Sequence, residues 1–542
     1  MPPRESGGGA GVVPASVVAV SRSRIAWLLI APSAVLIAVG ACTGKSAPAV
    51  SGDVDTASIV LAVPHEPVSL NPLAGYAEAG AAKIFDGLVE HRPDHGVDPA
   101  LAEELPQPSP DGRSWTVRLR PGVRFSDGTE FDARDVTATY AALRDPAFGS
   151  PLRARYDVLT GVTEVDPRTV RFDLAHAYAP FPNLLVLGIL PSEALTVPAP
   201  VTLPDPVPAG TGPYTVADWH RGERMVLRAN KSYFDGPPSV ETVTVRFVPD
   251  DERRAALVRE GTVDGAALPA RMARDFDGAD AFAVITQSSA DVRAVRMPAG
   301  NQVAADAAIR TALNHAVNRA ALVDGALAGR GSQVSVPLPP TLAEFVEPTA
   351  RFTYDMARAR QLLDAAGWTA GEDGTRARAG VPARFTLLYP TDDAVALGLA
   401  EAFAADARAV GVDVLPQPAD AATIEQRART EPSVIATGDP FDPDLSLFPL
   451  LHSLSGTAAA GVPRLDQALA AGRTVLDPAQ RAAEYRKLQR IYVAEPTMVA
   501  LAAVDHTYVM RDSWLGYEPV VDRQAQDATW GPWWNVERWQ RR

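Results

Sequence analysis

The sequence predicts an α/β protein that is built from two or three lobes. With 542 residues, the chain is too long to fold around a single hydrophobic core. A strand pattern at 243–248, a helix pattern at 253–260 and a strand pattern at 262–266 follow one another, which is typical of an α/β layer. A hydrophobic content of 46% and a charged content of 21% are ordinary for a soluble globular protein.

Turns and short strands dominate the first half of the chain. Gly210, Gly212 and Pro213 stand directly before Tyr214 and predict a sharply bent entry into a strand, because glycine tolerates positive φ and proline fixes φ. A β-hairpin pattern follows this entry. The predicted elements are strands at 59–63, 115–119, 170–174, 214–220 and 224–230, and helices at 79–88 and 133–143.

Helices dominate the second half of the chain. Aspartate or asparagine precedes several of the helix patterns and glycine follows them, as expected at helix N-caps and C-termini. Five of the nine tryptophans come after residue 513, which predicts that the C-terminal segment packs onto the body of the protein. The predicted elements are helices at 304–316, 319–328, 356–366, 394–410 and 478–494, and strands at 385–389, 412–415, 499–504 and 508–510.

The N-terminus has the pattern of a bacterial secretion signal. Two arginines precede an apolar run at 25–39, which contains a proline and is short for a membrane span. Cys42 is the only cysteine of the chain, so no internal disulfide can form. Residues 39–42 resemble a bacterial lipobox, which implies a signal peptide at 1–41, lipidation of Cys42 and a polar tether at 42–56.

Charge and motif content argue against several classes of function. The net charge of −14 is unfavourable for nucleic acid, because phosphate binding needs basic surfaces. The sequence contains no GxSxG elbow, no GxGxxG motif and no HExxH motif, so we predict no catalytic residue, no metal and no cofactor. His91 and His95 lie close in sequence, but their loop favours solvent-exposed histidines over a metal site. The pattern indicates recognition rather than catalysis.

One acidic loop is a candidate binding element. Asp439, Asp442 and Asp444 alternate with two prolines in the loop 438–444. A stiff loop lowers the entropic cost of holding a ligand, and a carboxylate suits a primary ammonium group. The alternative is a solvated turn that caps the next helix, and the pattern alone does not decide between the two.

The order of many short motifs resembles the peptide/nickel-type solute-binding proteins of ABC importers, a family that includes dipeptide- and oligopeptide-binding proteins. The resemblance runs from residue 59 to the C-terminus. Its motifs are PVSLNPL at 67–73, PALAE at 99–103, GVRFSDGT at 122–129, ARDV at 133–136, GTGPY at 210–214 and GTVD at 261–264, with further matches at 309–319, 354–368 and 481–492.

The resemblance implies a bilobal, type II periplasmic-binding-protein-like receptor that closes on its ligand and has no enzymatic turnover. Lobe I is expected at 57–298 with an inserted small subdomain at about 95–205, and lobe II at 299–494. Residues 495–542 are expected to return to lobe I. The implied partners are a peptide ligand, the permease and ATPase subunits of an ABC transporter, and the membrane through the lipid anchor, and we expect a monomer on the extracytoplasmic face.

The resemblance also implies ligand-binding residues. In peptide-binding relatives an aspartate at the position of Asp439 pairs with the peptide ammonium group, and Asp442 and Asp444 complete the motif. Main-chain groups of the loop 67–79, including Asn71 and Tyr76, and of the glycine-rich entry at Gly212 are expected to complete the cleft. The list of predicted ligand residues is Asp439, Asp442, Asp444, Asn71, Tyr76 and Gly212.

Ligand identity stays open at this level. Dipeptide-selective relatives place an arginine after the strand that matches 385–389, but residues 390–393 contain none, which favours longer peptides or a cationic non-peptide ligand. The alternatives are another solute, such as a nickel chelate, an oligosaccharide or a glutathione-like thiol, and a regulatory lipoprotein of the cell envelope without a transport role.

Overall fold

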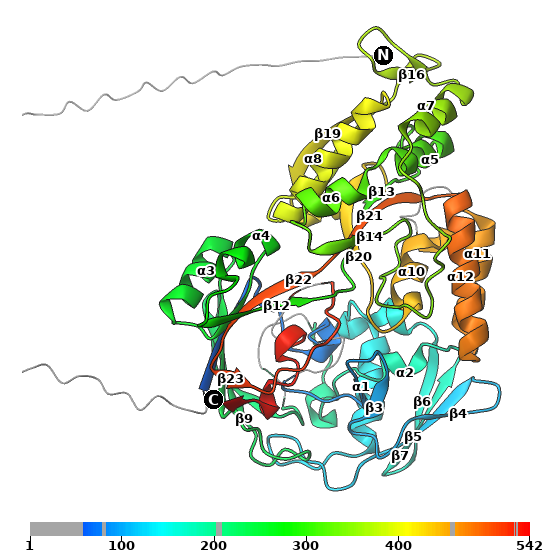
Figure 1. Ribbon diagram of the computed structural model, residues 1–542. Helices are drawn as coiled ribbons and strands as arrows, with labels where there is room; N and C mark the ends of the chain where they lie inside the picture. Colours follow the sequence, from blue (N-terminus) through cyan, green and yellow to red (C-terminus); the bar gives the residue numbers. More distant parts are fainter. Residues whose placement is uncertain are drawn as a thin grey trace, which may run out of the picture. The chain divides into compact units, whose positions relative to one another are not determined.

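The computed structural model describes residues 58–77, 83–201, 207, 209–455, 461–524, 526 and 529–542. Cys42, the signal peptide and the tether predicted at 1–56 lie outside the described residues. Two large mixed sheets organise the described part of the chain, and each is the centre of one predicted lobe (Figure 1). No helix in the described part combines the length and the apolar character needed to span a bilayer.

The sheet of lobe I contains seven of the described strands. Its central strand β1 pairs in parallel with β10 and β11, whereas the outer pairs are antiparallel. Helices α3 (Asp251–Glu260) and α4 (Ala270–Ala273) cover one face through a core that includes Leu257 and Phe276. The strand order is β12 (Phe282–Gln287), β22 (His506–Arg511), β11 (Gly265–Ala267), β1 (Ser58–Val63), β10 (Thr242–Phe247), β9 (Arg224–Ala229) and β8 (Tyr214–His220).

The sheet of lobe II contains six described strands and has helices on both faces. Helices α5 (Ala307–Ala316), α7 (Met356–Ala365) and α8 (Ala394–Ala409) share one core with it, and α10 (Pro443–Leu451), α11 (Pro463–Thr474) and α12 (Pro478–Ala494) share another. Asp355 and Asp477 cap α7 and α12 as predicted. The strand order is β14 (Gly331–Gln333), β21 (Met498–Val504), β13 (Val292–Arg296), β20 (Ser433–Thr437), β18 (Arg384–Pro390) and β19 (Asp413–Ala419).

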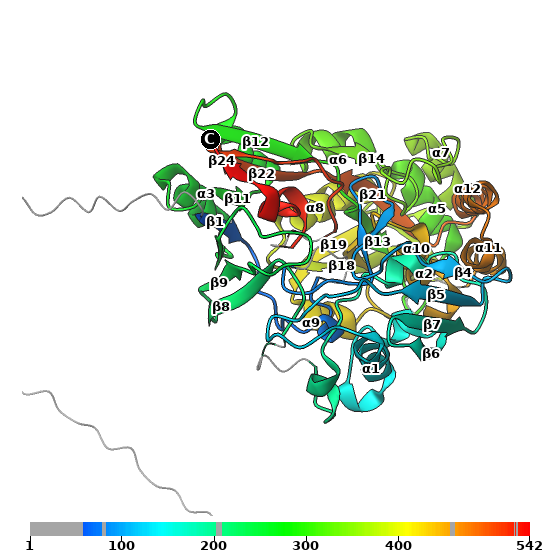
Figure 2. The same ribbon diagram turned by 90° about the horizontal axis from the view of Figure 1, so that it is seen from below.

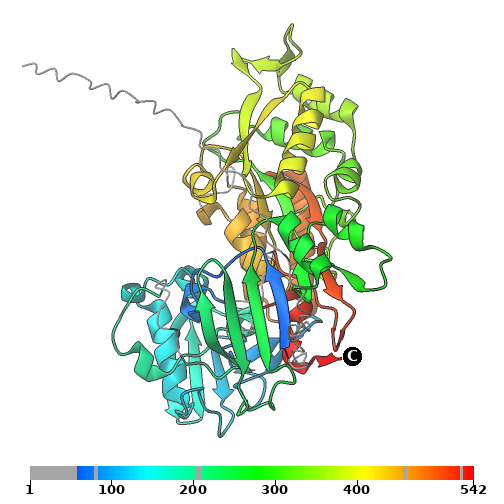
Figure 3. The same ribbon diagram turned by 90° about the vertical axis from the view of Figure 1, so that its left-hand side faces the viewer.

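A four-stranded sheet lies within the segment predicted as the inserted subdomain. Its order is β4 (Gln107–Pro108), β5 (Ser114–Arg118), β7 (Thr169–Leu174) and β6 (Leu159–Asp166). Helix α1 (Ala133–Arg144) packs beside it, and Asp132 and Asp135 form the capping box at its start. Figure 2 shows this sheet at the right of the view, with β8 and β9 of lobe I at the left, and Figure 3 shows the same part of the chain in cyan.

The remaining described elements are short. The small sheets pair β2 (Val89–His91) with β3 (Val97–Pro99), β15 (Thr369–Ala370) with β16 (Arg376–Arg378) and β17 (Val381–Pro382), and β23 (Trp514–Leu515) with β24 (Gln540–Arg541). The further helices are α2 (Phe181–Leu184), α6 (Arg319–Gly325) and α9 (Ala421–Gln426).

One predicted helix does not form in the described residues. Residues 83–88 of the helix expected at 79–88 are irregular, and 78–82 lie outside the described residues. The carbonyl oxygens of Lys83 and Ile84 accept hydrogen bonds from the backbone N–H of Tyr214 and Gly212, at 2.8 and 2.9 Å. Tertiary pairing with the glycine-rich entry therefore replaces the local helix.

The chain changes from one main sheet to the other at two described places. It leaves β12 of lobe I and enters β13 of lobe II through residues 288–291, earlier than the boundary expected at 298. It returns from β21 to β22 through Asp505 alone, so the first strand of the C-terminal segment belongs to lobe II rather than to lobe I. A backbone bond from Val504 N–H to Asp291 O, at 2.8 Å, joins the two crossings, and a bond from Ala290 N–H to Asp522 O, at 2.8 Å, joins the first crossing to the C-terminal segment.

A buried ionic network fills the region of these crossings. The Nδ1 of His506 lies 3.0 Å from Asp522, and its Nε2 lies 3.5 Å from Asp291. Arg293 also pairs with Asp291, at 2.7 Å, and Tyr508 donates to Asp522. Burial alone would lower the pKa of His506, but hydrogen bonds to Asp291 and Asp522 and their charges raise that pKa to about 9.

Because of this network, we expect His506 to contribute to the free energy of unfolding by an amount that depends on pH. Its pKa is raised from an unfolded value of about 6.5, so the stabilisation is complete below that pH and is lost as the pH rises through about 9. We expect His506→Asn to lower the free energy of unfolding by on the order of a few kcal/mol at pH 6. Urea denaturation should show the gap between wild type and variant shrinking from pH 6 to pH 9.5, and a gap that stays constant would contradict this role.

Candidate ligand-binding site

The loop that carries Asp439 begins where β20 ends. Gly438 follows the strand with a φ of 126°, a conformation that residues with a side chain rarely adopt. The carboxylate of Asp439 accepts backbone N–H bonds from Phe441 at 2.9 Å and from Asp442 at 3.0 Å. The loop is therefore held by its own side chain, as the spacing of acids and prolines predicts.

A cavity of about 300 Å³ opens beside Asp439. The Asp439 side chain is 17% exposed, and its Oδ2 lies 3.8 Å from Nη2 of Arg155, which is 25% exposed. Burial raises the pKa of Asp439, and the charges of Arg155 and Arg523 and the two backbone N–H bonds lower it in part. The lining consists of Arg155, Ala436, Thr437, Gly438, Asp439, Pro440, Leu445, Ser446, Pro449, Leu450, Arg523 and Gln524.

Asp442 and Asp444 occupy a different environment from Asp439. Asp442 caps α10 and forms a two-pronged pair with Arg481, at 2.9 and 2.7 Å. Asp444 is buried and accepts from Tyr178 at 2.8 Å and from Arg473 at 3.1 Å. Neither lines the Asp439 cavity, so their geometry supports structural ion pairs instead of the predicted ligand contacts.

Contacts between the lobes surround the same loop. Phe441 stacks on His91 with ring centroids 3.4 Å apart, and its edge meets Trp530 at 5.4 Å. Asp444 reaches Tyr178 of the inserted subdomain, whose neighbour Ala179 donates its backbone N–H to Arg473 O at 2.8 Å. His91 is buried against this loop, which corrects the expectation of a solvent-exposed histidine.

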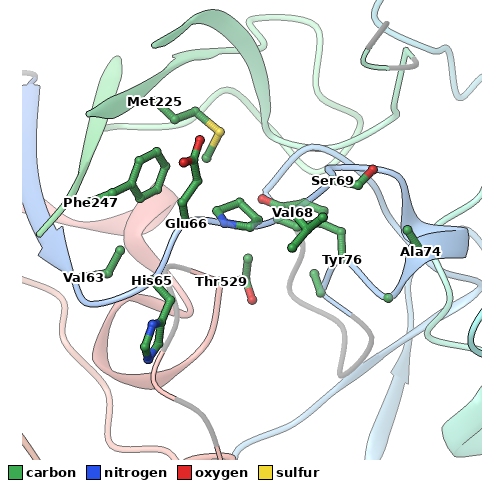
Figure 4. Close-up of a pocket in the computed structure, with 13 residues that line it drawn as sticks. Val63, His65, Glu66, Val68, Ser69, Ala74, Tyr76, Met225, Phe247 and Thr529 are labelled. Atoms are coloured by element: carbon green, nitrogen blue, oxygen red, sulfur yellow. The ribbon is translucent and has the colours of Figure 1, made fainter. Parts of the chain in front are cut away.

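The loop after β1 lines a second cavity, of about 430 Å³ (Figure 4). Tyr76 lines this cavity, and Met225 and Phe247 add apolar surface from neighbouring strands. Asn71 does not line it, and its side chain instead accepts from Leu73 N–H at 2.9 Å and shapes the turn before Tyr76. The cavity is lined by Val63, His65, Glu66, Pro67, Val68, Ser69, Ala74, Gly75, Tyr76, Ala77, Met225, Phe247 and Thr529.

Gly212 is used for packing and does not reach either cavity. Its N–H donates to Ile84 O at 2.9 Å, and its carbonyl accepts from Asn230 at 3.0 Å. A Cβ at position 212 would lie 2.5 Å from the Ile84 carbonyl carbon. The close approach that requires a glycine here is to the backbone of Ile84, so the predicted contact of Gly212 with a ligand is not supported.

Comparison with known proteins identifies the family of the chain. The family model described as bacterial extracellular solute-binding proteins, family 5 (middle region), matches residues 96–458. The chain belongs to this family. The solute-binding protein is 38% identical to Protein XP55 of Streptomyces lividans over 509 residues, which cover 92% of this chain and 94% of the relative. It is 28% identical to the nickel-binding periplasmic protein of Escherichia coli over 84% of this chain and 89% of that one.

Solved structures confirm the bilobal α/β fold of the solute-binding protein. NikZ from Campylobacter jejuni, in complex with Ni(L-His), superposes with a TM-score of 0.81 at 23% identity, over 90% of this chain and all of NikZ. The oligopeptide-binding protein AppA from Bacillus subtilis, in complex with a nonapeptide, gives 0.77 at 21% identity, over 90% of this chain and 99% of AppA. Members of this family are extracytoplasmic receptors of ABC importers.

Sequence reasoning missed two residues of the Asp439 cavity. Arg155 comes from a 3-10 turn at 153–156 in the inserted subdomain, and Arg523 comes from the C-terminal segment. Neither lies in a recognisable motif, and nothing local brings them together. In the described part of the solute-binding protein, no group of three or more His, Cys, Asp and Glu side chains could hold a metal ion.

Proposed function

We propose that this protein captures peptides on the extracytoplasmic side of the membrane and delivers them to an ABC permease. Asp439 is the proposed anchor for the peptide ammonium group. The observation that carries this proposal is a half-buried carboxylate, fixed by its own loop, that lines a cavity between elements of both lobes. Ammonium–carboxylate pairs in a partly buried site form strong, charge-assisted hydrogen bonds.

The second cavity supports a peptide because it offers mainly apolar surface next to Tyr76. We propose that it accepts an apolar side chain of the ligand, while the lobes close as a population shift that the ligand drives through its higher affinity for the closed state. Relatives of the same fold support the ligand class, since AppA binds a nonapeptide and DppA from Helicobacter pylori binds the peptide STSA. We further propose that lipidated Cys42 anchors the receptor to the membrane as a monomer.

The proposal predicts that Asp439→Asn weakens peptide binding by about tenfold to a hundredfold. Asparagine keeps the Oδ1 that accepts the two backbone N–H bonds but removes the charge that pairs with an ammonium group. The measurement is isothermal titration calorimetry with a peptide that stabilises the wild type in a thermal-shift screen. Asp373→Asn is the matched control, because this exposed aspartate also accepts a backbone N–H two residues on, from Thr375 at 2.9 Å.

Two results would overturn the proposal. One is equal peptide affinity in wild type and Asp439→Asn. The other is stabilisation of the wild type only by nickel–histidine complexes, oligosaccharides or glutathione, which would assign the same scaffold to another solute. A role as a regulatory envelope lipoprotein would instead show stabilisation by none of these solutes.

A further inference from the structure

Tyr178 of the inserted subdomain forms a buried contact with lobe II. Its hydroxyl donates to Oδ2 of Asp444 at 2.8 Å, and Nε of Arg473 donates to the same oxygen at 3.1 Å. A backbone bond crosses the same contact, from Ala179 N–H to Arg473 O at 2.8 Å. Tyr178 and Asp444 are both only 1% exposed, so the contact is closed to solvent.

This contact shares its supporting elements with the cavity that Asp439 lines. Arg155 lines the cavity from the subdomain, and residues of α10 line it from lobe II. Asp444 belongs to the first turn of α10. On the subdomain side, the neighbour of Arg155, Tyr156, donates to the carbonyl of the last residue of α2 at 2.9 Å, and Tyr178 lies three residues before α2. A separation of the subdomain from α10 therefore breaks the contact and opens the cavity at the same time.

The carboxylate of Asp444 depends on Tyr178 and Arg473 while the lobes are in contact. Its Oδ1 is buried and has no hydrogen-bond partner in the part of the chain that the structure describes. Burial raises the pKa of Asp444 to about 6, although the charge of Arg473 and the hydrogen bond from Tyr178 lower it. The loss of either partner leaves a buried charge poorly satisfied, whereas water solvates the same carboxylate once the lobes separate.

We propose that Tyr178, Asp444 and Arg473 form a latch between the lobes, which holds the walls of the Asp439 cavity together around a bound ligand. The latch rests on the proposed function, because it affects capture only if this cavity receives a ligand. Tyr178 is a positioning residue, since its hydroxyl bonds to Asp444 and not to the ligand. Loss of its hydrogen bond lowers the population of the binding-competent arrangement, and the apparent affinity falls by the same factor.

The test removes one hydroxyl group from each of two buried tyrosines. Tyr178→Phe removes the bond to Asp444 and keeps the ring. Tyr492→Phe is the matched control, because the hydroxyl of Tyr492 is also buried but donates within lobe II, to Met498 O at 2.9 Å. Calorimetry uses a peptide that stabilises the wild type in a thermal-shift screen. We expect Tyr178→Phe to bind it about threefold to thirtyfold more weakly, and Tyr492→Phe to bind it as the wild type does.

Amide hydrogen exchange measures the latch without a ligand. The N–H of Ala179 bonds across the contact to Arg473 O, whereas the N–H of Ala175 bonds to Val158 O inside the subdomain, both at 2.8 Å. In Tyr178→Phe we expect Ala179 to exchange about threefold faster or more than in the wild type, and Ala175 to keep its wild-type rate. Faster exchange at both positions would indicate local unfolding of the subdomain and would overturn the latch.

Arg473→Gln gives an independent reading from the other partner of Asp444. It removes the charge that pairs with Asp444 but keeps the carbonyl that accepts from Ala179, and it should also weaken peptide binding. Arg464→Gln is its control, because Arg464 lies on the same helix α11 but pairs with Glu495 of the same lobe, at 3.3 Å. Since Tyr178 and Arg473 belong to different lobes, a folding defect in one variant leaves the other to decide.

The outcomes separate the latch from the proposed function. Equal peptide affinity in wild type, Tyr178→Phe and Arg473→Gln overturns the latch and leaves peptide capture intact, whatever the exchange rate of Ala179. Failure of every peptide to bind the wild type overturns the proposed function. In that case, faster exchange of Ala179 alone in Tyr178→Phe still supports the latch, for a cavity that takes another solute, and unchanged exchange overturns the latch as well.

Discussion

Asp442→Ala is expected to lower the free energy of unfolding by about 3–5 kcal/mol, since the substitution leaves a buried guanidinium group without its anion. The side chains of Arg481 and Asp442 are only 9% and 5% exposed, and two hydrogen bonds of 2.9 and 2.7 Å join them. Asp442 also caps α10, so the helix loses its N-cap bond to Asp444 N–H. Chemical denaturation with urea measures the loss.

Two variants make this prediction specific. Lys487→Ala breaks the exposed pair with Glu484 on the same helix α12 and should cost less than about 1 kcal/mol. The double variant Asp442→Ala/Arg481→Met removes both charges and should be more stable than Asp442→Ala alone. A double variant that is no more stable than the single one would show that the unpaired charge is not the cause.

Gly438→Ala is expected to cost about 2–5 kcal/mol and to abolish ligand binding. The backbone at Gly438 has a φ of 126°, and an added Cβ would lie 1.9 Å from the carbonyl oxygen of Ala290 at the lobe crossing. The clash is with backbone, so no side chain can rotate away to relieve it. Relief requires the loop to move, and Asp439 moves with it.

Gly236→Ala separates the cost of the backbone conformation from the cost of the steric clash. Gly236 also has positive φ, at 98°, but a Cβ there would have nothing within 4 Å. This control should cost only about 1–2 kcal/mol, from backbone conformation alone. Thermal or urea denaturation of both variants, with calorimetry on any peptide that binds the wild type, checks the prediction. Equal losses for the two glycines would contradict the steric explanation.

Much of the fold could be predicted because its signals are local. The helix at 356–365 begins at its aspartate cap, and the hairpin of β8 and β9 flanks the turn that the sequence indicated. Four of the five tryptophans after residue 513 are buried, with Trp530, Trp533 and Trp539 at 1% exposure or less, whereas Trp534 is partly buried. The helix expected at 79–88 is wrong over 83–88, because backbone groups there pair with residues more than a hundred positions away.

The residues of the candidate site could be predicted from the sequence only in part. The sequence alone determined the family motifs and the fold class, and it singled out the loop at 438–444 as a candidate binding element, because each depends on residue order and on short-range turn chemistry. Only the tertiary structure decided which acids of that loop face a cavity. In the structure, Asp442 pairs with Arg481, and Asp444 pairs with Arg473 and Tyr178. Arg155 and Arg523 line the same cavity as Asp439. The physical reason is that partners in a charge pair are selected by distance in space, and residues 155, 439 and 523 meet only after both lobes have folded.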